Sequence, residues 1–326
     1  MKFTTICILS VLLAHGTTAK TVELIADRAF ERGLTTTDRG GKRQAIAWNT
    51  NAAPPVWFTA QHHSKSCFAD KVFQTRTTNG FSFKDDYQTL TIHPADDEAD
   101  FICGVNGSSE FGGVWRAQGD PWPHLYLNQQ ISVPGGHLGT NVLSLADIER
   151  IDFSANVRLL YDRKETGRAY VKQRHAAQYV CFFTIQNLNR KSTGFGDYYW
   201  FGITFYDDRE PVTKLHAMLD KGSEKKKGTG KLIYNIGIKP FSDKIVADGE
   251  WVSIEGDILP HIIAGLQECW RRGYLPDSQD LSDYRLGSFV LGWEVTGLND
   301  VAIAVKGLRA EAELKPRHSE LPRASN

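Results

Sequence analysis

The feature that most constrains this chain is its rhythm of short apolar runs, which Gly, Asn, Asp and Pro repeatedly interrupt. Runs bounded in this way are typical of antiparallel sandwiches and barrels. The sequence shows no internal repeat and no long linker. We therefore predict an all-β fold, an antiparallel β-sandwich of the jelly-roll type. The predicted strands are Val22–Ala26, Val56–Ala60, Thr89–His93, His124–Leu127, Ile151–Tyr161, Tyr179–Gln186, Tyr198–Tyr206, Lys231–Ile238, Trp251–Glu255, Ser288–Thr296 and Val301–Leu314.

One segment departs from the β pattern. Residues 258–270 place Ile262, Leu266 and Trp270 at helical spacing, with polar residues between them. Asp257 precedes this run as a candidate N-cap, and Gly273 follows it as a candidate stop. The pattern predicts one amphipathic helix that covers an edge of the sandwich.

The first nineteen residues have the pattern of a secretory signal peptide. A positive end at Met1-Lys2 is followed by a short apolar stretch and by small residues just before Lys20. The apolar stretch is too short to cross a bilayer as a helix. We therefore expect a secreted protein, extracellular or periplasmic, without a membrane anchor. The predicted organisation is a signal peptide over 1–19, one sandwich domain over 20–314 and a polar tail over 315–326.

The charge balance argues against nucleic acid as a partner. The chain has 38 Lys and Arg residues against 38 Asp and Glu residues. Nucleic-acid-binding domains carry a basic surplus, which this sequence lacks. A hydrophobic fraction of 41% is ample for a packed core.

Four cysteines follow the predicted signal: Cys67, Cys103, Cys181 and Cys269. An even number of cysteines in an exported protein favours disulfides. We predict a Cys67–Cys103 bridge, because both residues lie near expected loops. Cys181 and Cys269 either pair or remain as two buried thiols. No CxxC or HxxxH spacing occurs, so no zinc site is expected.

An acidic cluster over residues 96–100 contains Asp96, Asp97, Glu98 and Asp100. Hard cations such as calcium bind several such oxygens. The cluster lacks the Asp-x-Asp-x-Asp-Gly pattern of calcium loops, and the alternative is a solvated charged turn. We expect no cofactor, and a structural calcium ion here is the one exception that the sequence suggests.

Four of the predicted strands carry polar or aromatic side chains on one face, because successive strand residues alternate between faces. If these strands belong to one sheet, their exposed faces form a concave groove. Aromatic rings can stack on sugars while polar groups bind hydroxyls, so the groove predicts a polysaccharide or glycan as partner. The alternative is the solvated side of a sandwich. The predicted binding residues are Asn156, Arg158, Gln178, Gln186, Tyr198, Trp200 and Tyr206.

Glu294 is a carboxylate in the middle of a strand, and it is the first candidate for a catalytic role. Hydrolysis of a glycosidic bond needs two carboxyl groups, and Asp207 or Asp197 is the predicted partner. The alternative for the segment 207–210 is a charged turn with an internal Asp–Arg pair. A lyase would need a base instead, with an arginine to neutralise a uronate. The candidate bases are Tyr198, Tyr206 and His175, and the candidate cations are Arg158 and Arg174.

Three segments carry a resemblance to known proteins: Trp200–Arg209 (WFGITFYDDR), Trp251–Pro260 (WVSIEGDILP) and Gly292–Gly297 (GWEVTG). Over about residues 120–314 the chain resembles the concanavalin-like sandwiches of glycoside hydrolases, polysaccharide lyases and carbohydrate-binding modules. The resemblance implies a jelly-roll fold and a protein that acts on a polysaccharide as a glycoside hydrolase or lyase. A non-catalytic lectin, or a secreted interaction protein whose aromatic face is a protein interface, is the alternative. The paired-Glu motif of retaining sandwich hydrolases is absent, as is the ordered lyase signature.

Overall fold

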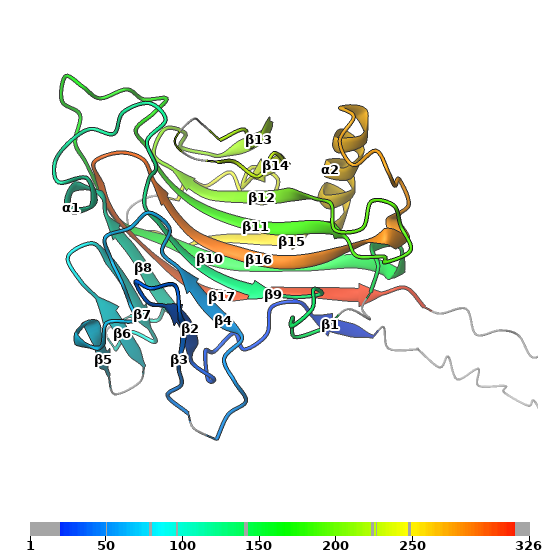
Figure 1. Cartoon of the computed structure of the whole chain (residues 1–326), viewed down its shortest axis with the longest axis horizontal. Helices are drawn as coiled ribbons and strands as arrows, with labels where there is room; N and C mark the ends of the chain where they lie inside the picture. The colour runs from blue at the N-terminus through cyan, green and yellow to red at the C-terminus, as the bar shows by residue number, and fades with distance from the viewer. Residues whose placement is uncertain are drawn as a thin grey trace, which may run out of the picture.

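The computed structural model describes residues 20–316, except 50, 78–79, 96, 140–142, 223–224, 226 and 247–248. Its strands form two sheets, and the long strands of both sheets run along the long axis of the molecule (Figure 1). This arrangement confirms the predicted all-β sandwich. The signal peptide predicted over 1–19 lies outside the described residues, as does most of the predicted polar tail. In the described part of the chain, no helix is long and apolar enough to span a membrane.

Sheet A has the strand order β15-β10-β17-β8-β7-β6-β5, and β1 pairs with β17 beside this path. The longest ladder joins β10 to β17 in antiparallel register, with three irregularities along its length. The strands of sheet A are β1 (Thr21–Glu23), β5 (Gln74–Arg76), β6 (Phe81–Lys84), β7 (Gln88–Ile92), β8 (Phe101–Asn106), β10 (Ile148–Lys164), β15 (Val252–Asp257) and β17 (Asn299–Leu314).

Sheet B has the order β13-β14-β12-β11-β16-β9-β4-β2-β3. Its pairs are antiparallel except for β12 with β14 and β2 with β4, which are parallel. The strands are β2 (Leu34–Thr37), β3 (Arg43–Ile46), β4 (Trp57–Ala60), β9 (His124–Gln130), β11 (Ala177–Asn187), β12 (Tyr198–Asp207), β13 (Lys214–Leu219), β14 (Leu232–Gly237) and β16 (Tyr284–Val295).

The core lies between the two sheets, because each long strand turns its apolar alternate residues inward. Trp293 of β16 is fully buried, and its indole nitrogen donates to the carbonyl of Cys103 on β8 at 2.9 Å. Its ring packs edge-on against Tyr179, with ring centroids 5.1 Å apart. Trp293 therefore links sheet B to sheet A through both packing and a hydrogen bond.

The predicted helix is present as α2 (Leu259–Arg271), one residue later than predicted at each end. Asp257 does not sit at the N-cap, which is Ile258, but its carboxylate accepts from the Leu259 backbone N–H at 3.0 Å. The helix covers one end of sheet B, where the Tyr199 hydroxyl donates to the Ile262 carbonyl at 2.6 Å. A short helix, α1 (Gly107–Phe111), lies at the opposite end of the molecule (Figure 1). Three 3-10 turns are η1 (Lys71–Phe73), η2 (Leu145–Asp147) and η3 (Leu281–Asp283).

The predicted Cys67–Cys103 disulfide is wrong. Cys67, Cys103, Cys181 and Cys269 are all free and buried. Cys103 points into the core from β8, whereas the Cys67 thiol lies 3.9 Å from the Thr37 carbonyl in another part of the chain. The disulfide was predicted because both cysteines lie near expected loops, but nearness to a loop does not show the direction in which a thiol points. Burial raises the pKa of the Cys269 thiol to about 12, so this thiol stays protonated at neutral pH.

Replacing Trp293 with alanine tests the link between the sheets. We expect Trp293→Ala to lower the free energy of unfolding by about 3–5 kcal/mol, because it leaves a cavity and an unpaired carbonyl. Val72→Ala, at a side chain that is 82% exposed, is the control and should change stability by less than about 0.5 kcal/mol. Urea unfolding followed by circular dichroism measures both, and equal stability of the two variants would contradict this account of the core.

Candidate functional site

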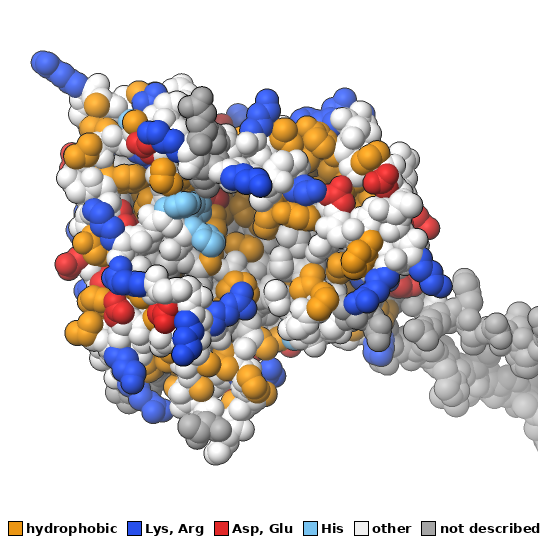
Figure 2. Space-filling view, in the orientation of Figure 1, with side chains coloured by type: hydrophobic (Ala, Val, Ile, Leu, Met, Phe, Trp, Pro, Cys, Tyr) orange, Lys and Arg blue, Asp and Glu red, His pale blue; other side chains and the backbone are white. Residues whose placement is uncertain are grey.

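The candidate site is the outer face of sheet B, the face turned away from sheet A. Figure 2 views the molecule from this side and shows a hollow near its centre, with apolar atoms inside it and histidine side chains at its edge. In this face, one cross-strand row joins four strands in register: His124 of β9, Glu294 of β16, Gln178 of β11 and Asp207 of β12. Residues paired in this way share a face, so the row crosses the centre of the sheet.

Glu294 is the carboxylate of this row that accepts hydrogen bonds from the neutral side chains of Tyr126 and Trp122. The Tyr126 hydroxyl donates to its Oε1 at 2.6 Å, and the Trp122 indole donates to its Oε2 at 3.3 Å. His124 Nε2 lies 4.0 Å from Oε2. The Glu294 side chain is still 21% exposed, so a ligand on this face can reach it. Burial and the nearby charge of Glu294 raise the pKa of Tyr126, so this hydroxyl keeps its proton and remains a donor.

Trp122, His124 and Tyr126 are residues of the candidate site that the sequence analysis missed. They alternate along one face at the start of β9, and the Trp122 and His124 rings stack with centroids 5.5 Å apart. The sequence analysis predicted the strand over His124–Leu127. It did not consider that Trp122, His124 and Tyr126 alternate with other residues and so share one face of this strand. The pattern Trp-x-His-x-Tyr was the signal in the sequence that could have identified them.

Asp207 reaches the outer face only because of a β-bulge in β12. Tyr179 pairs with Tyr206 and Val180 with Thr204, so Phe205 is an extra residue opposite β11. Uninterrupted alternation would have placed Tyr206 beside Trp200 on the outer face. The bulge instead turns Tyr206 inward, where its ring packs against Trp293 and its hydroxyl donates to Asp162 at 2.7 Å. The predicted role of Tyr206 in the groove is therefore wrong.

Asp207 is saturated by its neighbours. Arg209 donates to both of its oxygens from the side chain, at 2.8 and 2.7 Å, and to Oδ1 from the backbone. Gln178 donates to Oδ2 at 2.7 Å. The side chain of Asp207 is only 9% exposed. This is the internal Asp–Arg pair that the sequence analysis gave as the alternative to catalysis. Asp197 is similarly paired with Lys231.

His175 lies away from the outer face. It is fully buried, its Nδ1 accepts from the Val171 backbone N–H at 2.9 Å, and its Nε2 lies 2.9 Å from the Arg116 carbonyl. The Trp115 ring packs on it with centroids 4.7 Å apart. These contacts occupy both ring nitrogens, so the structure gives His175 a role in holding two loops together.

Asn156 and Arg158 belong to the wrong sheet for the predicted groove. Both are on β10, which pairs with β15 and β17 in sheet A. Arg158 forms an ion pair with Asp97, and its guanidinium lies 4.7 Å from the centroid of the Trp251 ring. Alternation correctly separated the two faces of this strand, but it could not show which sheet the strand joins.

The remaining predicted binding residues do share the outer face of sheet B. Tyr198 and Trp200 project from β12, with ring centroids 5.5 Å apart in an edge-on arrangement. The Phe182 ring of β11 lies 5.9 Å from that of Trp200. Gln186 pairs in register with Tyr198 and donates to the Gly196 carbonyl at 3.0 Å. The face therefore has an aromatic end on β12 and β11 and a carboxylate end at Glu294.

The acidic cluster predicted for calcium is used in ion pairs. Asp97 pairs with Arg158, Glu98 pairs with Lys306 at 2.7 Å, and Asp100 accepts from the Gly307 backbone N–H at 2.7 Å. Asp96 lies outside the described residues. No group of three or more His, Cys, Asp and Glu side chains in the described part of the chain could hold a metal ion.

Comparisons with known proteins find similarity in structure only. No protein-family model and no curated protein matches the sequence. A family 11 xylanase from Neocallimastix patriciarum is similar at a TM-score of 0.38 and 10% identity, over 78% of this chain and 99% of that one. A family 12 xyloglucanase from Bacillus licheniformis is similar at 0.39 and 10%, over 79% and 100%. Endoglucanase 3 of family GH12 from Trichoderma harzianum is similar at 0.35 and 13%, over 81% and 100%.

These neighbours are named as a xylanase, a xyloglucanase and an endoglucanase. The similarity assigns no fold family, activity or residue role to this chain.

Arg116 holds the Trp122 side of the site in place. Its guanidinium lies 5.2 Å from the centroid of the Trp122 ring and donates to the carbonyls of Asp120 at 2.8 Å, Arg174 at 3.0 Å and Thr296 at 3.3 Å. We expect Arg116→Ala to lower the free energy of unfolding by about 2–3 kcal/mol, because it leaves several carbonyls unpaired. Arg168→Ala, an exposed arginine in the neighbouring loop, should have little effect. Urea unfolding of both variants measures the difference, and equal stability would contradict this role.

Asp162 gives a test of pH dependence. Burial, as the largest effect, raises its pKa above the ordinary 3.8, although the bond from Tyr206 partly opposes this. When the pKa of a carboxyl group is higher in the folded than in the unfolded protein, the folded state favours the protonated form. The group then stabilises the fold at low pH, and this contribution is lost as the pH rises through the folded-state pKa. The free energy of unfolding of the native protein relative to Asp162→Asn should therefore fall as the pH rises from the ordinary value of 3.8 toward neutral pH. A difference that stays constant, or rises, in urea unfolding over this range would contradict the assignment.

Proposed function

We propose that this protein is a carbohydrate-active protein of the glycoside hydrolase kind, which holds a neutral polysaccharide on the outer face of sheet B. The observation that carries the proposal is Glu294, a partly exposed carboxylate with the Tyr126 and Trp122 donors aimed at it. Tyr198 and Trp200 lie along the same face, where their rings can stack on sugars while Gln178 and Gln186 bind hydroxyls. Glu294 is the proposed reacting carboxylate.

The charges of this face favour a neutral polymer. Arg209 is paired with Asp207, and Lys231 with Asp197. Arg285 donates to the backbone carbonyls of Ser282 and Asp283. Arg209 and Lys231 are therefore neutralised by carboxylates of the protein itself, and the Nη1 group of Arg285 is held by backbone carbonyls. Of the residues predicted for a lyase, the bases His175 and Tyr206 and the cation Arg158 do not lie on this face, whereas the candidate base Tyr198 does.

A second candidate function is carbohydrate binding without turnover. It is favoured because the residues beside Glu294 in the cross-strand row do not provide a second free carboxylate. A retaining glycoside hydrolase, which forms a covalent intermediate, uses two carboxyl groups about 5–5.5 Å apart. Adjacent strands lie roughly 4.8 Å apart, so such a partner for Glu294 would lie on an adjoining strand. The residue on the adjoining β11 is the amide Gln178. The next carboxylate, Asp207, lies two strands from Glu294 and is tied to Arg209. Under this alternative, Glu294 accepts hydrogen bonds from sugar hydroxyls.

The deciding experiment incubates the purified protein with hydroxyethylcellulose, galactomannan and glucomannan, and follows reducing ends together with binding. We expect turnover of at least one neutral polymer, and a loss of roughly 10²–10⁴-fold in Glu294→Gln, because an amide can act neither as a general acid nor as a carboxylate base. Trp200→Ala should weaken binding while leaving the Glu294 contacts intact. Asp207→Asn is the matched carboxylate control and should retain turnover if the protein folds.

The possible outcomes separate the two functions. Full turnover in Glu294→Gln would show that the hydrolase assignment is wrong. Binding that depends on Trp200 without any release of reducing ends would establish the second candidate. Absence of both binding and turnover with every polymer would reject carbohydrate as the ligand of this face.

A further inference from the structure

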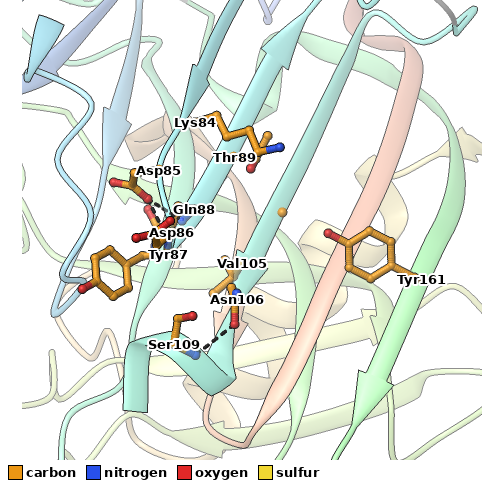
Figure 3. A pocket seen from close by; sticks show the side chains of 11 residues that line it. Lys84, Asp85, Asp86, Tyr87, Gln88, Thr89, Val105, Asn106, Ser109 and Tyr161 are labelled. Atoms are coloured by element: carbon orange, nitrogen blue, oxygen red, sulfur yellow. Dashed lines mark hydrogen bonds between the residues drawn. The ribbon is translucent and has the colours of Figure 1, made fainter. Parts of the chain in front are cut away.

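A second hollow lies on the opposite side of the molecule, on the outer face of sheet A. It has a volume of about 480 Å³ and lies over β7, β8 and β10 (Figure 3). Three of its lining residues, Tyr161, Gly104 and Thr89, belong to one cross-strand row, in which Tyr161 pairs with Ala302, Ala302 with Gly104, and Gly104 with Thr89. A Cβ on Gly104 would lie 3.3 Å from the Cβ of Ala302, so the absence of a side chain here keeps the floor low.

Tyr161 forms one wall of this hollow. Figure 3 shows its ring reaching over β17 toward β8, with the hydroxyl directed into the open space. The side chain is 39% exposed, and among the described residues its hydroxyl has no hydrogen-bond partner. The guanidinium of Arg163 lies 4.9 Å from the ring centroid. On the strands of sheet A that the structure describes, Tyr161 is the one large apolar side chain that is exposed. An exposed ring in a polar hollow is a suitable surface for stacking a ligand.

The opposite wall supplies both donors and acceptors. Lys84 and Thr89 point toward the hollow from β6 and β7, and Asp86 follows in the turn between them (Figure 3). Lys84 and Asp86 have no ion-pair partner within the described part of the chain. Asp85 is already bound by the Ser66 hydroxyl at 2.6 Å and by the backbone N–H groups of Tyr87 and Gln88.

These groups define the chemistry of the ligand. The lining carries the ammonium of Lys84 and the carboxylates of Asp85 and Asp86, and the guanidinium of Arg163 lies against the Tyr161 ring. Two cations therefore face two carboxylates, so the hollow attracts neither an anion nor a cation strongly. An aromatic ring with hydroxyl, ammonium and carboxylate groups around it complements a neutral molecule that is rich in hydroxyls. We propose that this hollow is a second carbohydrate-binding site, centred on Tyr161 and separate from the Glu294 face. The choice of a neutral polysaccharide as its ligand rests on the proposed function.

Affinity electrophoresis of the full chain, through gels that contain hydroxyethylcellulose or galactomannan, tests this site. We expect Tyr161→Ala to weaken retardation roughly tenfold in apparent Kd, an effect that corresponds to about 1.4 kcal/mol. Tyr161→Phe keeps the ring and should retain most of the binding. Val72→Ala is the surface control and should migrate like the native protein. Circular dichroism confirms that each variant is folded.

The double variant Trp200→Ala/Tyr161→Ala distinguishes the two sites. Additive losses from Trp200→Ala and Tyr161→Ala support two independent sites. If Trp200→Ala abolishes retardation and Tyr161→Ala migrates like the native protein, the second site is overturned and the groove stands. If only Tyr161→Ala weakens retardation, the second site stands and the proposed function of the Glu294 face fails. No retardation of the native protein in either gel overturns both.

Discussion

The buried indole of Trp293 is the contact on which the rest of the structure depends. It packs on Tyr179 within sheet B and donates to the Cys103 carbonyl of sheet A, so it fixes both the spacing of the sheets and the register of β16. Because side chains alternate along a strand, an inward Trp293 requires an outward Glu294. The same residue pair therefore connects the stability of the core to the chemistry of the outer face.

Strand register and one β-bulge together decide which side chains lie on the outer face of sheet B. Register brings Glu294 between His124 and Gln178, while the bulge at Phe205 exchanges the positions that Tyr206 and Asp207 would otherwise have. The exchange places Tyr206 in the interior, bonded to Asp162, and Asp207 beside Gln178, where Arg209 neutralises it. Glu294 is then the carboxylate of this row whose contacts come from neutral donors, which is why the functional proposal centres on it.

Much of the fold could be predicted from local sequence. Every predicted strand is present, and α2 lies within one residue of its prediction, because long periodic runs carry their own signal. Short or interrupted strands were missed, including β8, whose Gly104 breaks the pattern, and the exposed edge strand β13. The helix α1 was not predicted. It has only five residues, and an Asn106 cap and crossing contacts with β17 stabilise it.

The sequence by itself determined the class of fold, the inward and outward faces of most strands, and the candidate residues Glu294, Trp200 and Tyr198, because alternation is a local property of the backbone. Only the tertiary structure decided which strands share a sheet, which removed Arg158 from the groove and placed Tyr161 over a hollow on the other side. It also decided the partners of Asp207 and the positions of the thiols. Strand order, bulges and ion pairs depend on contacts between residues far apart in the chain, and no local pattern in the sequence specifies them.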